Sequence, residues 1–260
     1  MAHPLHIVDA FTDHPFAGNP AGVVQLDEAA EAEWMQAVAA ELNLADTAFL
    51  VPRADGDHDL RWFTPAKEVD LCGHATLASA HVLGGTRRFH TRVGELICTP
   101  DDDGRIAMDL PTHPTEPAPH DGWGPILGLD DRQICSARAS ADWDLIEVAD
   151  AAAVEAAESR REPLLTRRGH AIVVADTTGA DGDIDTVCRV FAPSAGIDED
   201  PVTGSAHTVI GPWIAERTGR TAFRCRQASA RGGLLDLEVA GDRVVLRGRA
   251  VTVISGELRA

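Results

Sequence analysis

The chain has 260 residues, of which 44% are hydrophobic and 25% charged, and this composition excludes collagen-like, disordered and disulfide-stapled proteins. Its 41 acidic and 23 basic residues give a formal net charge of -18. A field of that sign repels nucleic acid and anionic lipid, so neither is expected as a partner. The same field repels a small anionic substrate, and local dipoles must therefore hold any such ligand.

The five cysteines are scattered along the chain, and no CxxC pair or metal-like cluster of cysteine and histidine accompanies them. This usage is typical of a reducing compartment and predicts neither a disulfide framework nor a metal site. The N-terminal stretch lacks a basic segment followed by a long apolar run, and no apolar stretch approaches ~20 residues. We therefore expect a cytoplasmic protein without a signal peptide or a membrane span.

The first part of the chain is predicted to contain one amphipathic helix among several short strands. Trp34, Val38 and Leu42 recur every four residues on one face of this helix, which Asp27 can cap. Turn signals such as Asp-Gly separate several of the strands. The predicted strands are 6–11, 47–51, 60–64, 95–99 and 105–110.

A second helix is expected to open at Gly73 and to stop at Gly84. Its buried face is predicted to carry Leu77, His81 and Val82. Beyond it, prolines at positions 111, 114, 117, 119 and 125 stiffen an otherwise polar stretch.

These prolines predict a domain boundary. We expect an N-terminal domain over residues 1–113, a linker over 114–125 and a C-terminal domain over 126–249. The last strand, near 250–260, is expected to return to the first domain.

The second half repeats the mixture of strands and helices. A helix is expected to open at Gly204 and continue through Val209, Ile210 and Trp213, and a weaker one to cover 149–159. The predicted strands are 171–176, 234–239, 243–247 and 251–254.

The two halves carry a weak internal echo. One reads FTP followed by EVDLCGHA, and the other reads FAP followed by EDPVTGSA. Aligning Gly73 with Gly204 pairs Glu68 with Glu199, and both stretches run into an apolar helix. The echo arises either by chance or from a duplicated unit whose two copies face each other across a cleft.

The helix starts at Gly73 and Gly204 are candidate anion sites. A glycine there lets backbone N–H groups approach a ligand, and the positive end of the helix dipole favours a carboxylate or phosphate. The alternative is that each glycine only permits a tight turn. Beside them, His74, Asp200 and Ser205 can hydrogen-bond a ligand, although a histidine at a helix start also serves as a cap or a packing residue.

Two further side chains are candidates for proton transfer. Asp46 lies between the first helix and a strand, where burial raises the pKa of a carboxyl group towards such a role; the alternative is an ordinary Asx turn or strand-entry cap. Cys72 could be a thiolate at a helix N-terminus or a buried structural cysteine, and the structural reading is favoured. Its counterpart in the echo is Thr203, which argues against a two-cysteine racemase.

Five ordered motifs spanning positions 16–233 resemble the phenazine biosynthesis PhzF-like family. Any one of them is a weak signal, but their order along nearly the whole chain makes the resemblance specific. The motifs are Phe16-Ala-Gly-Asn-Pro20, Asn43-Leu-Ala-Asp-Thr-Ala-Phe49, Asp70-Leu-Cys-Gly-His-Ala-Thr-Leu77, Glu199-Asp-Pro-Val-Thr-Gly-Ser-Ala-His207 and Gln227-Ala-Ser-Ala-Arg-Gly-Gly233.

The resemblance implies an α+β fold that is diaminopimelate-epimerase-like. In such a fold two similar domains each wrap a curved sheet or barrel around a central helix, with the active site in the cleft between them. It further implies a cofactor-independent isomerase, often a homodimer, in which a carboxylate moves a proton between carbons. By motif, Asp46 takes the acid/base position, and the amides of Gly73 and Gly204 lie near a substrate carboxylate. The substrate-contacting positions become Asn19, His74, Asp200 and Ser205.

One departure from the family pattern concerns Asp46, where relatives typically have glutamate. Aspartate is one methylene shorter, so its reach falls by about 1.5 Å, and a misplacement of that order can cost ~10²-fold in rate. The leading hypothesis is an isomerase of a small carboxylate-bearing metabolite. The alternatives are an epimerase or racemase of a hydroxy- or amino-acid, and a carboxylate-binding protein with weak or no catalysis.

Overall fold

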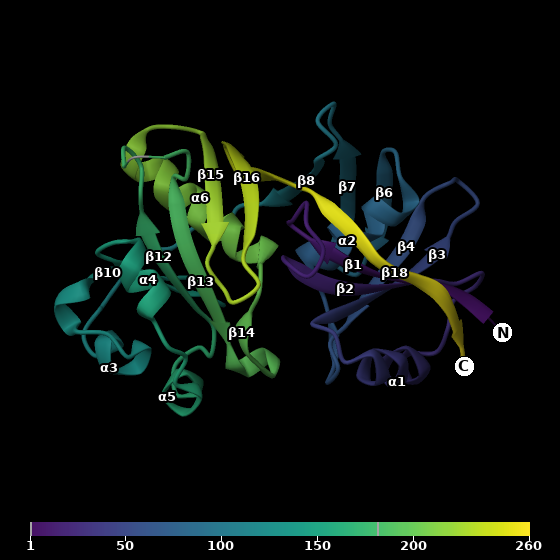
Figure 1. Ribbon diagram of the computed structural model, residues 1–260, viewed down its shortest axis with the longest axis horizontal. Helices are drawn as coiled ribbons and strands as arrows, with labels where there is room; N and C mark the ends of the chain where they lie inside the picture. The colour runs from purple at the N-terminus through teal and green to yellow at the C-terminus, as the bar shows by residue number, and fades with distance from the viewer. Residues whose placement is uncertain (1, 181) are drawn as a thin grey trace. The chain divides into compact units, whose positions relative to one another are not determined.

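Figure 1 shows the computed structural model, which describes residues 2–180 and 182–260 as a sheet-dominated α+β fold. The chain divides into two compact units, residues 1–109 with 247–260 and residues 110–246. Residues 114–125, expected to form a linker, lie within the second unit. They contain the short strand β9 (Glu116–Ala118), which pairs with β10, and Trp123, which is 1% exposed.

The first unit is built from nine strands and two helices over the residues described. Strand β18 is the C-terminal strand and pairs antiparallel with β1, so the chain end returns to this unit (Figure 1). The elements are β1 (Ala2–Ala10), β2 (Asn19–Gln25), α1 (Ala32–Leu42), β3 (Asp46–Pro52), β4 (His58–Phe63), β5 (Glu68–Val69), α2 (Gly73–Leu83), β6 (Arg87–Thr91), β7 (Gly94–Pro100), β8 (Ile106–Pro111) and β18 (Ala250–Arg259).

The second unit continues from the end of β8 and contains a longer series of elements. Besides β9 they are α3 (Trp123–Leu127), the 3-10 turn η1 (Asp131–Gln133), β10 (Ile134–Ala139), β11 (Asp144–Val148), α4 (Ala151–Ala156), α5 (Arg161–Leu165), β12 (Ala171–Asp176), β13 (Thr186–Ala192), the 3-10 turn η2 (Pro193–Ala195), β14 (Ile197–Asp200), α6 (Gly204–Thr218), β15 (Ala222–Gln227), β16 (Gly233–Ala240) and β17 (Arg243–Gly248).

The pairing pattern of the first unit recurs in the second. In the first, β2 is parallel to β3, β3 is antiparallel to β4, β4 is antiparallel to β5 and parallel to β6, and β6 is antiparallel to β7. The strands β11 to β16 repeat these relations in the same order. The two domains are therefore similar, as the echo and the family resemblance predicted.

The burial of the helices α2 and α6 follows from their sequences, which are rich in apolar and small residues. All residues of α2 from Gly73 to Ala80 are buried, and the helix contacts β1, β2, β3 and β18. In α6 most residues are also buried, and that helix contacts β12 and β16. A helix that is apolar on all sides is stable only inside a core, so each unit encloses its glycine-headed helix.

The duplication extends to two arginine side chains that the echo did not include. Arg61 in β4 donates from Nε and Nη2 to the two carboxylate oxygens of Glu68, at 2.7 and 2.9 Å. Arg189 in β13 donates in the same way to Glu199, at 2.7 and 2.8 Å. Each guanidinium also lies over the ring of the phenylalanine two residues later, at 5.3 and 5.1 Å from the ring centroid. Bidentate pairs repeated at matching positions favour a duplicated unit over a chance echo.

Several helix boundaries differ from the sequence expectation. The prediction that Asp27 caps the first helix was wrong, because α1 begins at Ala32 and the extended residue Glu31 holds the N-cap position. In α4 the cap is Asp150, whose side chain accepts a hydrogen bond from the backbone N–H of Ala153 at 2.8 Å. Among the residues described, no helix has the length and apolar character needed to cross a membrane.

Candidate active site

The N-terminus of α2 has no capping side chain. Its N-cap residue, Cys72, is extended and makes no side-chain cap hydrogen bond. Gly73 and His74, the first two helical residues, are buried. The first-turn amides of a helix have no partner within the helix, and the positive end of the dipole lies there. These properties suit the binding of an anion at this end of α2, which stays a prediction.

Asp46 is brought to the same place by the strand order. It is the first residue of β3, and its parallel register sets it opposite Ala21 of β2. Its Oδ2 lies 3.8 Å from Nε2 of His74, and the two side chains are 14% and 5% exposed. The structure thus joins two predicted site residues into one pair of a partly buried carboxylate and a buried imidazole.

His74 is held as a neutral imidazole. Burial lowers the pKa of His74 to about 3, because a charged ring loses its hydration there. Its Nδ1 lies 3.4 Å from the thiol sulfur of Cys72, while its Nε2 makes no hydrogen bond with any described residue. His74 is therefore suited to hydrogen bonding with a ligand, and at neutral pH it supplies no positive charge.

Sequence reasoning favoured a structural role for Cys72. The structure places its thiol in contact with His74, and one atom from each of Asp46, Cys72 and His74 lies within 4.8 Å of the other two. No sequence spacing marks this triad, because Asp46 reaches it only through the pairing of β3 with β2. The CGH sequence was the one available signal.

Asn19 begins β2 and is fully buried, opposite Ala10 of β1. The loop before it has an unusual backbone. Gly18 has φ +64°, and a Cβ there would lie 2.2 Å from the carbonyl oxygen of Ala10, so only glycine fits. Phe16 also has positive φ, and its N–H donates to Oδ2 of Asp9 at 2.7 Å. The FAGNP motif is thus a tightly built turn that sets the position of Asn19.

In the second unit, Asp200, Gly204 and Ser205 lie around the N-terminus of α6. The N-cap residue Thr203 makes no side-chain cap hydrogen bond and instead donates from Oγ1 to Oδ2 of Asp200 at 2.5 Å. The buried amide of Gln227 accepts from the Thr203 N–H at 2.8 Å and donates to the Asp200 carbonyl at 2.7 Å. Gln227 supports the site through these hydrogen bonds. It lies in one of the five motifs, but nothing in the sequence predicts a role for it.

His207 lies one turn into α6 and is fully buried. Its Nδ1–H donates to the carbonyl oxygen of Thr203 at 2.8 Å, and its Nε2 lies 3.8 Å from the thiol of Cys188. Burial lowers the pKa of His207 to about 4, against a smaller opposing effect of the hydrogen bond from its ring to Thr203. The second unit thus has its own buried, neutral imidazole.

This buried imidazole predicts a loss of stability in acid. The unfolded chain binds a proton on His207 below its ordinary pKa of 6.5, whereas the folded ring resists protonation down to about 4. The stabilising contribution is present above pH 6.5 and is lost as the pH falls to about 4, in total about 3 kcal/mol. Urea unfolding at pH 7 and pH 4.5 should show a shallower pH dependence for His207→Gln than for the parent. His14→Gln, at an exposed position, should keep the parental dependence; equal slopes in all three proteins would contradict the assignment.

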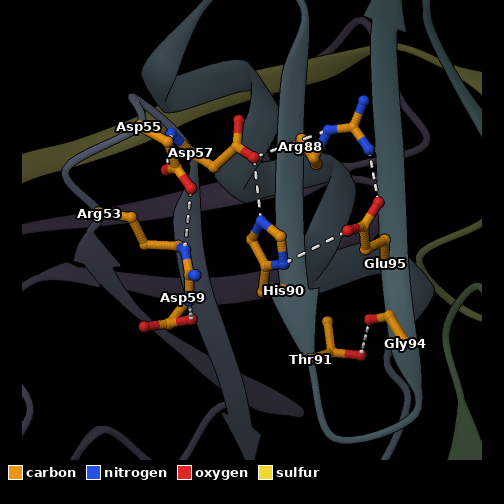
Figure 2. A network of polar contacts seen from close by, with 9 residues as sticks. All are labelled: Arg53, Asp55, Asp57, Asp59, Arg88, His90, Thr91, Gly94 and Glu95. Atoms are coloured by element: carbon orange, nitrogen blue, oxygen red, sulfur yellow. Dashed lines mark hydrogen bonds and ion pairs between the residues drawn. The ribbon is translucent and has the colours of Figure 1, made fainter.

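A second polar cluster lies away from these residues in the first unit (Figure 2). His90 of β6 has Nε2 2.9 Å from Oδ2 of Asp57 and Nδ1 3.6 Å from Oε1 of Glu95. Arg88 pairs with both of these carboxylates, and Arg53 lies 3.5 Å from Asp55. Each of these carboxylates already pairs with an arginine, which indicates a structural network that joins the turn before β4 to β6 and β7.

A cavity of about 320 Å³ lies beside this network. Its walls are mainly apolar, with Met35, Phe49 and Leu60 among the lining residues. Asp59, which pairs with Arg53, also lines the cavity, as do His90 and Thr91, and all three are drawn in Figure 2. None of the predicted site residues lines it. The cavity and the candidate active site are therefore separate features of the first unit.

Comparison with known proteins matches residues 8–256 to the family model described as phenazine biosynthesis-like protein. A protein of Pseudomonas aeruginosa named an uncharacterized isomerase is 44% identical over 96% of both chains. A crystal structure of a phenazine biosynthesis protein of the PhzF family from Enterococcus faecalis covers all of both chains, with 35% identity and a TM-score of 0.92. A hydroxyproline epimerase from Agrobacterium vitis, solved with bound trans-4-hydroxy-L-proline, has a similar fold at 12% identity and a TM-score of 0.62, over 99% of this chain and 92% of the other.

Proposed function

Because this chain belongs to the phenazine biosynthesis-like protein family, we propose that it is a cofactor-independent isomerase of a small carboxylate-bearing metabolite. The observation that carries the proposal is the pair of Asp46 and neutral His74 at the uncapped N-terminus of α2. The name of the Pseudomonas relative supports the reaction class. The hydroxyproline bound to the fold relative supports the ligand class, since that ligand also bears a carboxylate.

In the proposed mechanism Asp46 removes a proton from a carbon next to an unsaturated or carboxylated centre and returns it to another carbon. Removing the proton leaves negative charge on the substrate. The amides at Gly73, together with the positive end of α2, stabilise that charge. His74 donates a hydrogen bond from its neutral ring, and Asn19, Asp200, Gly204 and Ser205 are the further proposed substrate contacts. The motifs predict that the N-termini of both helices bind the same ligand.

The second unit does not repeat Asp46 and Cys72, which favours double-bond migration over epimerisation by two opposed bases. Phe63 pairs with Thr47 of β3, and its counterpart Phe191 pairs with Ala171 of β12. The position equivalent to Asp46 is therefore His170, which is not a carboxylate. The counterpart of Cys72 at the start of α6 is Thr203, which is not a thiol. The duplicated unit therefore repeats the framework of the site without the carboxylate of Asp46 and the thiol of Cys72.

The proposal is tested by a melting-temperature screen of aromatic and aliphatic carboxylates against the full chain. We expect ligands that raise the melting temperature to exchange a carbon-bound proton with D₂O, with migration of a double bond, as followed by NMR. Stereochemical scrambling without migration would favour the epimerase alternative. Binding without any exchange would leave a carboxylate-binding protein. The homodimer implied by the family resemblance and the cytoplasmic location expected from the sequence stay predictions.

A further inference from the structure

The contact between Asp46, Cys72 and His74 combines three side chains that are all metal ligands. One atom from each lies within 4.8 Å of the other two, and the sulfur of Cys72 is 3.4 Å from Nδ1 of His74. Bond lengths of ~2.3 Å for Zn–S and ~2.0 Å for Zn–N place tetrahedral ligand atoms roughly 3.3–3.6 Å apart. We propose that Asp46, Cys72 and His74 form a binding site for Zn²⁺, which takes the acid/base carboxylate as a ligand.

Burial and charge both support this assignment. The three side chains are almost fully enclosed, since Cys72 is buried and the side chains of His74 and Asp46 are 5% and 14% exposed. Zn²⁺ with one carboxylate and one thiolate has no net charge, so the loaded site avoids burying an uncompensated ion. The formal charge of -18 attracts divalent cations to the molecule as a whole.

The site is open to solvent on one side, and metal binding releases one proton. The Asp46 side chain keeps 14% exposure, which leaves access for the ion and for water as a fourth ligand. On binding, the thiol of Cys72 gives its proton to solvent and its sulfur bonds to the metal. The bound metal competes with proton transfer by Asp46, and this consequence, unlike the binding itself, rests on the proposed function.

The cluster of Asp55, Asp57 and His90 is the alternative metal site in the first unit (Figure 2). It differs in two measurable ways. It contains no cysteine, and its carboxylates already pair with Arg53 and Arg88. A metal bound there would show no sulfur ligand, whereas a metal at Cys72 must show one.

The experiment is a titration of the reduced, chelator-treated full chain with Co²⁺, followed by absorption spectroscopy. We expect one equivalent of Co²⁺ to give a thiolate-to-cobalt charge-transfer band and the visible bands of tetrahedral cobalt, and added Zn²⁺ to bleach both. Cys72→Ser should abolish the charge-transfer band, and Asp46→Asn should keep the thiol but weaken Zn²⁺ binding at least tenfold. Cys135→Ser removes an exposed thiol in the second unit and should leave the spectrum unchanged, as should His90→Gln.

Melting temperatures without metal show whether each variant is folded, and the Asp46→Asn titration tests the site independently of Cys72→Ser. Absence of a charge-transfer band in the parent would overturn the proposal. So would loss of that band in Cys135→Ser, or binding that depends on His90 alone. None of these readouts needs a substrate. A cobalt charge-transfer band together with no proton exchange in the carboxylate screen would therefore support the metal site and contradict the proposed isomerase activity.

Discussion

Replacing Asp46 with asparagine is expected to lower the rate of ligand proton exchange into D₂O by about 10²- to 10⁴-fold, the range that general acid–base catalysis supplies. Asparagine has nearly the same shape but cannot accept the proton. It also keeps an oxygen towards His74, which lies 3.8 Å from the present carboxylate. Ligand affinity, measured by melting-temperature shift or calorimetry, should therefore change by less than tenfold. NMR of the ligand in D₂O measures the exchange.

Two matched variants control this result. Asp46→Glu keeps the carboxylate and restores the length typical of the family, so it should retain exchange within about tenfold of the parent, whereas asparagine should not. Asp103→Asn changes a carboxylate in an exposed turn of the same unit and should leave exchange unchanged. Undiminished exchange in Asp46→Asn would remove Asp46 from the mechanism. Equal losses in the asparagine and glutamate variants would indicate a role in packing.

Replacing Leu77 with alanine is expected to lower the free energy of unfolding by about 3–4 kcal/mol, as for large cavities in rigid cores. Leu77 is fully buried in the middle of α2. The surrounding core is tight, because a Cβ placed on Gly248 would lie 2.5 Å from Cδ1 of Phe11 and 3.1 Å from Cδ1 of Leu77. Close-packed neighbours can move only a little into the space left by the truncation. Most of the free energy lost to the cavity should therefore remain lost. Urea unfolding followed by circular dichroism measures the change.

Ile254→Ala is the control for Leu77→Ala. Ile254 lies on β18 in the same unit and is 53% exposed, so its truncation should cost about 0.5 kcal/mol or less. A loss below about 1 kcal/mol for Leu77→Ala would mean that α2 is not the rigid centre of the unit. Since α2 carries Gly73 and His74 at its first turn, we also expect weaker ligand binding in Leu77→Ala.

Local patterns in the sequence determined the elements whose signals are self-contained. The helix starts at Gly73 and Gly204 were predicted correctly, because a glycine followed by an apolar run marks a helix start. The ordered motifs also identified the family and the two similar domains. Strands such as β2 and β11 were not predicted, since a short apolar run has no period that separates a buried strand from other buried structure. The cap at Asp27 failed because a capping residue type recurs in ordinary turns.

The sequence by itself therefore determined the family and which side chains are candidates, whereas the repeated strand pairing of the structure favoured a duplication over a chance echo. The tertiary structure decided which of them meet. Asp46 contacts His74 because β3 pairs in parallel with β2, a long-range register that no local spacing encodes. Cys72 joins the group because it lies two residues before His74 at the start of α2, and burial makes His74 neutral. Side-chain contacts and desolvation depend on which residues the fold encloses. The chemistry of the site therefore follows from the tertiary structure and not from local sequence.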